Sequence, residues 1–248
     1  MDQFVTAGEE ERNEIRRRTG YQKIVDTCTQ AQRDDLEWLW VDTCCIDKKS
    51  SSELSEAINS MYEWYHLAKQ CYVYLHDTVG DTLTHWDESM AIPKWFSRGW
   101  TLQELVAPRV VQFFDQNWEC IGDREQHASI LNRITRVPMG TLKIGFGGPR
   151  PSVAQIMSWA ADRTTTREED RAYSLLGLLG VQMPMLYGEG KNAFRRLQLE
   201  IIRKSNDQSI FAWGWSKKTG LSDSFLADDP SWFRDCSSVI SLAPDEFI

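Results

Sequence analysis

Apolar positions along the chain fall either into short continuous runs or into helical spacing. Three short runs rich in β-branched and aromatic residues lie at 37–42, 70–75 and 109–115. A run of this kind is typical of a strand buried on both faces, as in a parallel sheet. Four stretches carry apolar residues about one helical turn apart, at 21–33, 50–68, 95–106 and 123–136. The alternation predicts an α/β fold, with a doubly wound parallel sheet flanked by helices.

The pattern changes at residues 143–151, where three glycines and two prolines predict a boundary or a loop. Beyond it, apolar spacing predicts helices near 152–162, 168–179 and 190–204. Residues 1–20 are dense in charge and predict a solvated arm. We therefore expect a charged arm over 1–20, a sheet domain over 21–142 and a mainly helical extension over 143–248. The extension is expected to pack on the sheet domain through Trp159, Tyr173, Leu176, Leu179, Phe194 and Leu197.

Composition narrows the class of protein. Apolar residues make up 42% of the 248 residues and charged residues 26%, which are ordinary values for a globular chain. No apolar run approaches the roughly 20 residues that a membrane span needs, and the N-terminus has no apolar signal core. The net charge of −8 argues against a nucleic-acid partner. These features predict a cytoplasmic protein.

Two kinds of chemistry find little support in the sequence. Six cysteines are too few for a disulfide scaffold, and none forms a C-x₂-C pair, so no metal site is expected. The turn at Gly188–Lys191 lacks the spacing of a phosphate-binding loop, because Met185 and Asn192 occupy its defining positions.

Three carboxylates are candidate site residues. Asp42 ends the first predicted strand and Asp47 lies in the loop that follows, at the sheet edge where α/β proteins bind ligands. Glu104 lies one helical turn after Trp100. A carboxyl group beside an aromatic ring can have a raised pKa or contact a sugar. The alternative for Glu104 is a structural role, as a surface residue or as a brace paired with Arg98 or Arg109.

Three separate blocks resemble fungal heterokaryon-incompatibility (HET) domain proteins, and the resemblance covers about residues 21–215. The first block is 39–47 (LWVDTCCID), with Trp40, Cys45 and Ile46 as motif residues. The second is 98–104 (RGWTLQE), with Arg98 and Gln103 as motif residues. The third runs from 165–177 (TTREEDRAYSLLG) to 187–190 (YGEG).

This resemblance implies a TIR-like, flavodoxin-like fold. Some TIR domains hydrolyse NAD with a glutamate in a W-x-x-x-E arrangement, which 100–104 (WTLQE) matches. By resemblance, Glu104 would be catalytic, with Asp42, Asp47 and Trp100 near the substrate. NAD would be a substrate, and no bound cofactor is implied.

The resemblance also implies a strand ahead of the first visible one, and the sequence shows nothing like it. We therefore expect an N-terminally truncated HET domain. The implied role is signalling in allorecognition and programmed cell death. The chain would act as an adaptor that associates with itself or with other HET- or NLR-type signalling proteins, or alternatively as an NAD glycohydrolase using Glu104.

Overall fold

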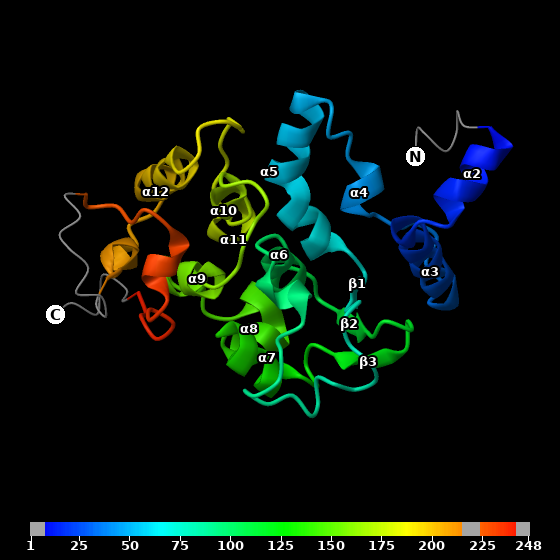
Figure 1. The fold of residues 1–248 in the computed structure, drawn as a ribbon. Helices are drawn as coiled ribbons and strands as arrows, with labels where there is room; N and C mark the ends of the chain where they lie inside the picture. The colour runs from blue at the N-terminus through cyan, green and yellow to red at the C-terminus, as the bar shows by residue number, and fades with distance from the viewer. Residues whose placement is uncertain (1–7, 215–223, 242–248) are drawn as a thin grey trace. The chain divides into compact units, whose positions relative to one another are not determined.

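A computed structural model describes residues 8–214 and 224–241 of the chain. They fall into two compact units, the first ending at Ala57 and the second beginning at Ile58. Helix α5 (Ser51–Leu67) starts in the first unit and ends in the second (Figure 1). The boundaries predicted near residues 20 and 142 stay predictions.

The first unit contains α2 (Glu9–Arg16), α3 (Thr19–Arg33), α4 (Asp42–Cys45) and the start of α5. Ser50 Oγ accepts a hydrogen bond from the Glu53 backbone N–H at 3.3 Å, which caps α5. The Glu53 carboxylate accepts from the Asp47 N–H at 2.8 Å, so it fixes the preceding loop. Ser50 and Glu53 have the spacing of a capping box. The half in which the Ser50 hydroxyl accepts from the Glu53 N–H is present.

The strand predicted at 37–42 is wrong. Residues 37–41 are not part of a strand, and residue 42 begins α4. Trp38 is 90% exposed, so the run is not buried on both faces.

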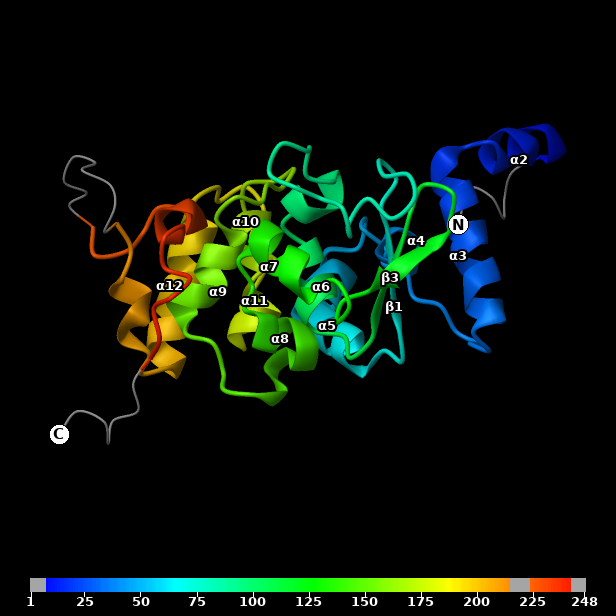
Figure 2. The same cartoon turned by 90° about the horizontal axis from the view of Figure 1, so that it is seen from below.

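The second unit holds a three-stranded mixed sheet in the order β1–β2–β3 (Figure 1), and Figure 2 shows β1 and β3 in the view turned by 90°. Strand β1 (Cys71–Tyr74) pairs in parallel with β2 (Val111–Phe114), as the apolar runs predict. Strand β3 (Cys120–Asp123) pairs antiparallel with β2, with an irregular register at Phe113 and Phe114. The expectation of a wholly parallel sheet is therefore wrong for β3.

The crossover from β1 to β2 contains the 3₁₀ turn η1 (Lys94–Ser97) and α6 (Thr101–Val106). After the sheet follow α7 (Ala128–Thr135), α8 (Met139–Ile144) and the 3₁₀ turn η2 (Gly145–Gly147). The helix predicted from residue 123 begins five residues later, because Asp123 ends β3.

The rest of the described chain is helical. Ser152 and Gln155 form a capping box that starts α9 (Val153–Ala160). The helix predicted over 168–179 is two short helices, which α12 follows. The elements after α9 are α10 (Asp170–Tyr173), α11 (Leu176–Leu179), α12 (Asn192–Lys204), η3 (Gln208–Phe211) and η4 (Pro230–Phe233).

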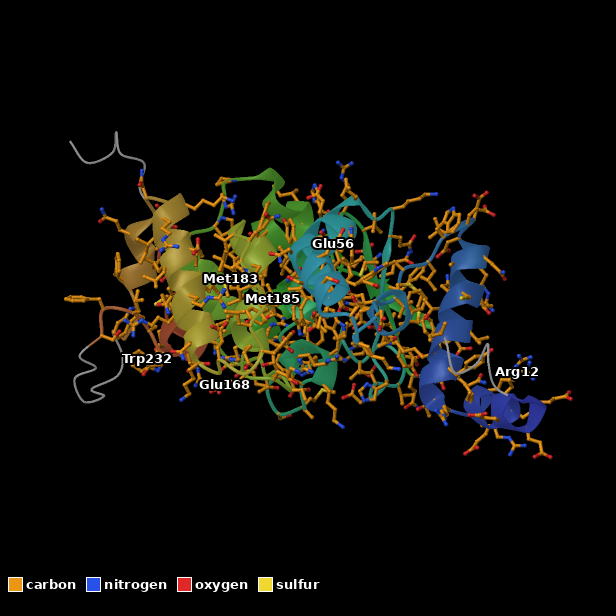
Figure 3. The ribbon with its side chains drawn as sticks, turned by 90° about the horizontal axis from the view of Figure 1, so that it is seen from above. Arg12, Glu56, Glu168, Met183, Met185 and Trp232 are labelled. Carbon is orange, nitrogen blue, oxygen red and sulfur yellow. The ribbon has the colours of Figure 1, made fainter. Side chains whose placement is uncertain are left out.

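The six apolar side chains expected to join this helical part to the sheet part are all buried, and both parts belong to the second unit. A direct link is the Gln103 Nε2–H of α6, which donates to the Ser174 carbonyl between α10 and α11 at 2.8 Å. The loop after α11 is also fixed, since the Asn59 side chain of α5 forms hydrogen bonds with both the N–H and the carbonyl of Met183 at 3.3 Å. Figure 3 labels Met183 and Met185 on this loop.

Helices α5 and α11 approach closely at Gly177. A Cβ atom added there would lie 2.1 Å from Tyr62 Cβ, which is far inside van der Waals contact. The close packing of the two helices therefore explains why position 177, in the third sequence block, is a glycine.

We predict that Gly177→Ala lowers the free energy of unfolding by about 1–3 kcal/mol, because two packed helices must separate. The measurement is urea denaturation followed by circular dichroism. Gly140→Ala is the matched control, since that α8 position has no atom within 4 Å of an added Cβ. The control is expected to gain about 0.5–1 kcal/mol from helix propensity. Equal behaviour of the two variants would contradict the close packing.

Candidate functional site

The second and third sequence blocks lie side by side in the second unit. The Gly99 N–H donates to the Thr164 carbonyl at 2.8 Å, and the Thr164 N–H donates to the Ser97 carbonyl at 2.6 Å. A Cβ atom added at Gly99 would lie 2.5 Å from Thr165 Cγ2. The backbone of 97–99 therefore lies close to 164–165, and any side chain at position 99 would require Thr165 to move.

A buried arginine joins these two segments. Arg163 is 3% exposed, and its Nη1 donates to the Arg98 carbonyl and to Thr101 Oγ1, both at 2.8 Å. Its Nε donates to the Trp159 carbonyl at 3.2 Å. Burial lowers the pKa of Arg163 to about 9, and the charge of Glu104 acts in the opposite direction. The guanidinium stays charged at neutral pH.

Glu104 lies half-buried on α6. Its Oε2 accepts a hydrogen bond from the indole N–H of Trp95, a buried residue, at 3.2 Å. Burial raises the pKa of Cys71, and the charge of Glu104 raises it further.

The other motif residues of α6 also have structural partners. Trp100 acts to lower the pKa of Asp170, against the larger effect of burial, which raises it. The Gln103 side chain is fully buried and donates to Ser174, as described above; its Oε1 has no partner within 8–214 and 224–241. The Arg98 side chain is exposed, and its carbonyl is the acceptor for Arg163.

Hydrogen bonds between side chains and backbone join the two segments of the third block, 165–177 and 187–190. Glu169 is buried, and its Oε1 accepts from the N–H groups of Gly188 and Gly190 at 2.7 and 3.0 Å. Both glycines have positive φ angles, 105° and 56°, which favour glycine. The pKa of Glu169 is lowered by its own backbone N–H and by those of Gly190 and Gly188.

Two tyrosines complete this cluster. The Tyr187 hydroxyl donates to Asp170 at 2.9 Å, and the Tyr173 hydroxyl donates to Glu189 at 2.8 Å. Burial raises the pKa of Asp170, and burial raises the pKa of Tyr173 to about 12. Both tyrosines therefore stay protonated donors at neutral pH.

The first sequence block lies in the first unit. Asp42 is half-buried as the first residue of α4, and the exposed Asp47 accepts from the Lys49 N–H at 2.9 Å. Ile46 is buried, Trp40 is half-buried and Cys45 is exposed. Because Asp42 and Asp47 belong to one unit and Glu104 to the other, a shared substrate cleft stays a prediction.

Two pockets of about 650 and 490 Å³ occur in the second unit. Glu104 lines neither of them, and the smaller one is lined in part by Arg163, Thr164 and Thr165. Among the described residues, no three His, Cys, Asp or Glu side chains are grouped to hold a metal ion. None of the described helices has the length and apolar character to cross a bilayer.

Arg163 and Glu169, which join separate segments of the chain, were not predicted from the sequence. Both stand among many charged residues in 162–171, and the acceptors of Arg163 include two backbone carbonyls, which leave no side-chain signal.

Comparisons with known proteins agree with the resemblance seen in the sequence. Residues 7–91 match the family described as Heterokaryon incompatibility protein (HET), and residues 192–247 match a Domain of unknown function (DUF8212). Over 190 residues the chain is 47% identical to Vegetative incompatibility protein HET-E-1 of Podospora anserina. The alignment covers 73% of this chain and 14% of that protein. No solved structure matches. The chain is a heterokaryon incompatibility (HET) domain protein.

We predict a pH-dependent effect of Glu169→Gln, which keeps an acceptor oxygen and removes the charge. A lowered folded-state pKa stabilises the fold above the unfolded value, about 4.3 for glutamate, and this stability is lost as pH falls through the folded pKa. Urea midpoints measured from neutral to acidic pH should therefore show the variant weaker at neutral pH, with a gap that narrows in acid.

Glu168→Gln is the matched control, because Glu168 is the exposed neighbour. It removes one carboxylate from the same segment and leaves the hydrogen bonds of Glu169 to Gly188 and Gly190 in place. A gap for Glu169→Gln that stays constant down to acidic pH would contradict the role given to its charge.

Proposed function

We propose that this chain is a cytoplasmic signalling module of fungal allorecognition that acts as an adaptor in programmed cell death. It would work by associating with copies of itself or with other HET- or NLR-type signalling proteins. The similarity to a vegetative incompatibility protein supports the biological role.

The adaptor mechanism rests on one observation, which is that motif side chains form hydrogen bonds with other segments of the same chain. Gln103 and Glu169 form hydrogen bonds with backbone groups of neighbouring segments. Side chains that bond their own framework shape a surface, and they are not displayed toward a small-molecule substrate.

A second candidate is an NAD glycohydrolase with a TIR-like or flavodoxin-like fold. The parallel β1–β2 pair with α6 in its crossover supports such a fold. Trp100 and Glu104 lie one turn apart at α6, as the W-x-x-x-E spacing requires. In this proposal Glu104 would hold the ribose hydroxyls of NAD and stabilise an oxocarbenium-like transition state.

The adaptor is the better supported of the two. Glu104 already accepts the Trp95 indole N–H, and it lines neither of the two pockets described above. Residues 98–104 also lie outside the part of the chain that matches the HET family.

The test expresses the full chain from an inducible promoter in a filamentous fungus and counts dye-permeable cells. The purified chain is assayed in parallel for nicotinamide release from NAD. Glu104→Gln keeps size and hydrogen bonding and removes the charge. Glu125→Gln is the matched control, since Glu125 is exposed.

We expect the wild type and both variants to kill equally, without nicotinamide release. If the wild type releases nicotinamide, and Glu104→Gln alone abolishes both release and death, the glycohydrolase replaces the adaptor. If no form causes death, the proposed signalling role is wrong.

A further inference from the structure

Two cysteines that the proposed function does not use lie together on α4. The Sγ atoms of Cys44 and Cys45 are 4.0 Å apart. Cys45 is exposed and Cys44 is half-buried, so solvent reaches the pair. Both residues, with all the contacts described next, belong to the first unit.

The hydrogen bonds give the two thiols different roles. The Val41 backbone N–H donates to Cys45 Sγ at 3.4 Å, so this exposed sulfur accepts a hydrogen bond. The Cys44 thiol donates to the Val41 carbonyl at 3.7 Å, which requires its proton. Burial, followed by the neighbouring Cys45, raises the pKa of Cys44 to about 11, so Cys44 stays protonated at neutral pH.

We propose that Cys44 and Cys45 form a reversible oxidation site for a hydroperoxide. The Cys45 thiolate attacks the peroxide, the O–O bond breaks, and Cys45 becomes a sulfenic acid while the peroxide leaves as hydroxide or alkoxide. The Cys44 thiol then attacks the sulfenic sulfur, a disulfide forms, and water leaves with the Cys44 proton. Sulfur loses two electrons, which the peroxide gains.

The product would be a strained disulfide. Adjacent Cα atoms are about 3.8 Å apart, whereas disulfides usually join Cα atoms at least about 4.4 Å apart. Strained, exposed disulfides are the readily reduced ones, so cellular thiols would reverse the reaction.

Closure of the disulfide would also open α4. The single turn depends on the Cys44 and Cys45 N–H groups, which donate to the Val41 carbonyl at 3.1 and 2.8 Å. Asp42 begins this turn and Asp47 follows it closely, so oxidation would change the conformation of the first sequence block. The inference is independent of the proposed signalling function.

The chain offers a direct test by peptide mass. Trypsin cleaves after Arg33 and Lys48, and the peptide 34–48 contains Cys44 and Cys45 and no other cysteine. The full chain is treated with a limited amount of hydrogen peroxide, alkylated and digested. We expect this peptide to lose two hydrogen atoms and to take up no alkyl group unless it is first reduced.

Cys28 is the internal control, because it is exposed, lies in the same unit and falls in the separate peptide 24–33. Its alkylation should persist at peroxide levels that close the Cys44–Cys45 pair. A peptide 34–48 that keeps both alkyl groups while Cys28 is oxidised would overturn the proposal.

Two variants test the assigned roles. Cys44→Ser leaves Cys45 to be oxidised without closure, so we expect sulfinic acid on Cys45 in place of the two-hydrogen loss. Cys45→Ser leaves Cys44, which should lose alkylation more slowly than Cys45 does in Cys44→Ser. The reverse order of rates would overturn the assignment of Cys45 as the attacking thiolate.

Discussion

The buried guanidinium of Arg163 is the interaction on which the arrangement of the second unit depends. It donates to the Arg98 carbonyl, the Trp159 carbonyl and the Thr101 hydroxyl, and so joins the end of α9 to the start of α6. Burial of a charge is costly unless its donors find acceptors, and the lowered pKa of Arg163 reflects that cost. Nε and Nη1 have acceptors, whereas Nη2 has none among the described residues. A shift of the two segments would leave further donors of this buried charge without acceptors.

The other motif residues extend this framework. Glu169 holds the turn at Gly188 and Gly190, and Gln103 bonds the backbone between α10 and α11. In each case a polar side chain satisfies backbone groups of another segment, which is the condition for burying irregular chain. The second and third sequence blocks are thus joined by hydrogen bonds within the second unit, and this use of their side chains favours the adaptor over the enzyme.

The sequence predicts the parts of the fold that depend on local pattern. The apolar runs around Val73 and Phe113 predict the parallel pair. The prediction succeeds because both side chains are fully buried in the sheet. The run at 37–42 is equally apolar, yet Trp38 is exposed and the run forms no strand. An apolar run does not specify which strand, if any, it will pair with. Strand β3 has one buried apolar residue, Ile121, which is too little for an alternating signal. For the candidate site, the spacing of Trp100 and Glu104 was enough to place them on one helix. The hydrogen bonds of Arg163 could not be predicted, because its acceptors are mainly backbone carbonyls, which every sequence has.

The most direct test of this account is the unfolding free energy of Arg163→Met, which keeps the long side chain and removes every donor. Arg195→Met on the exposed face of α12 is the matched control. We predict that Arg163→Met loses about 2–3 kcal/mol, because the Arg98 and Trp159 carbonyls and the Thr101 hydroxyl each lose a charged donor. The control should change little. A variant at 163 as stable as the control, or more stable than the wild type, would contradict the central role given to this arginine.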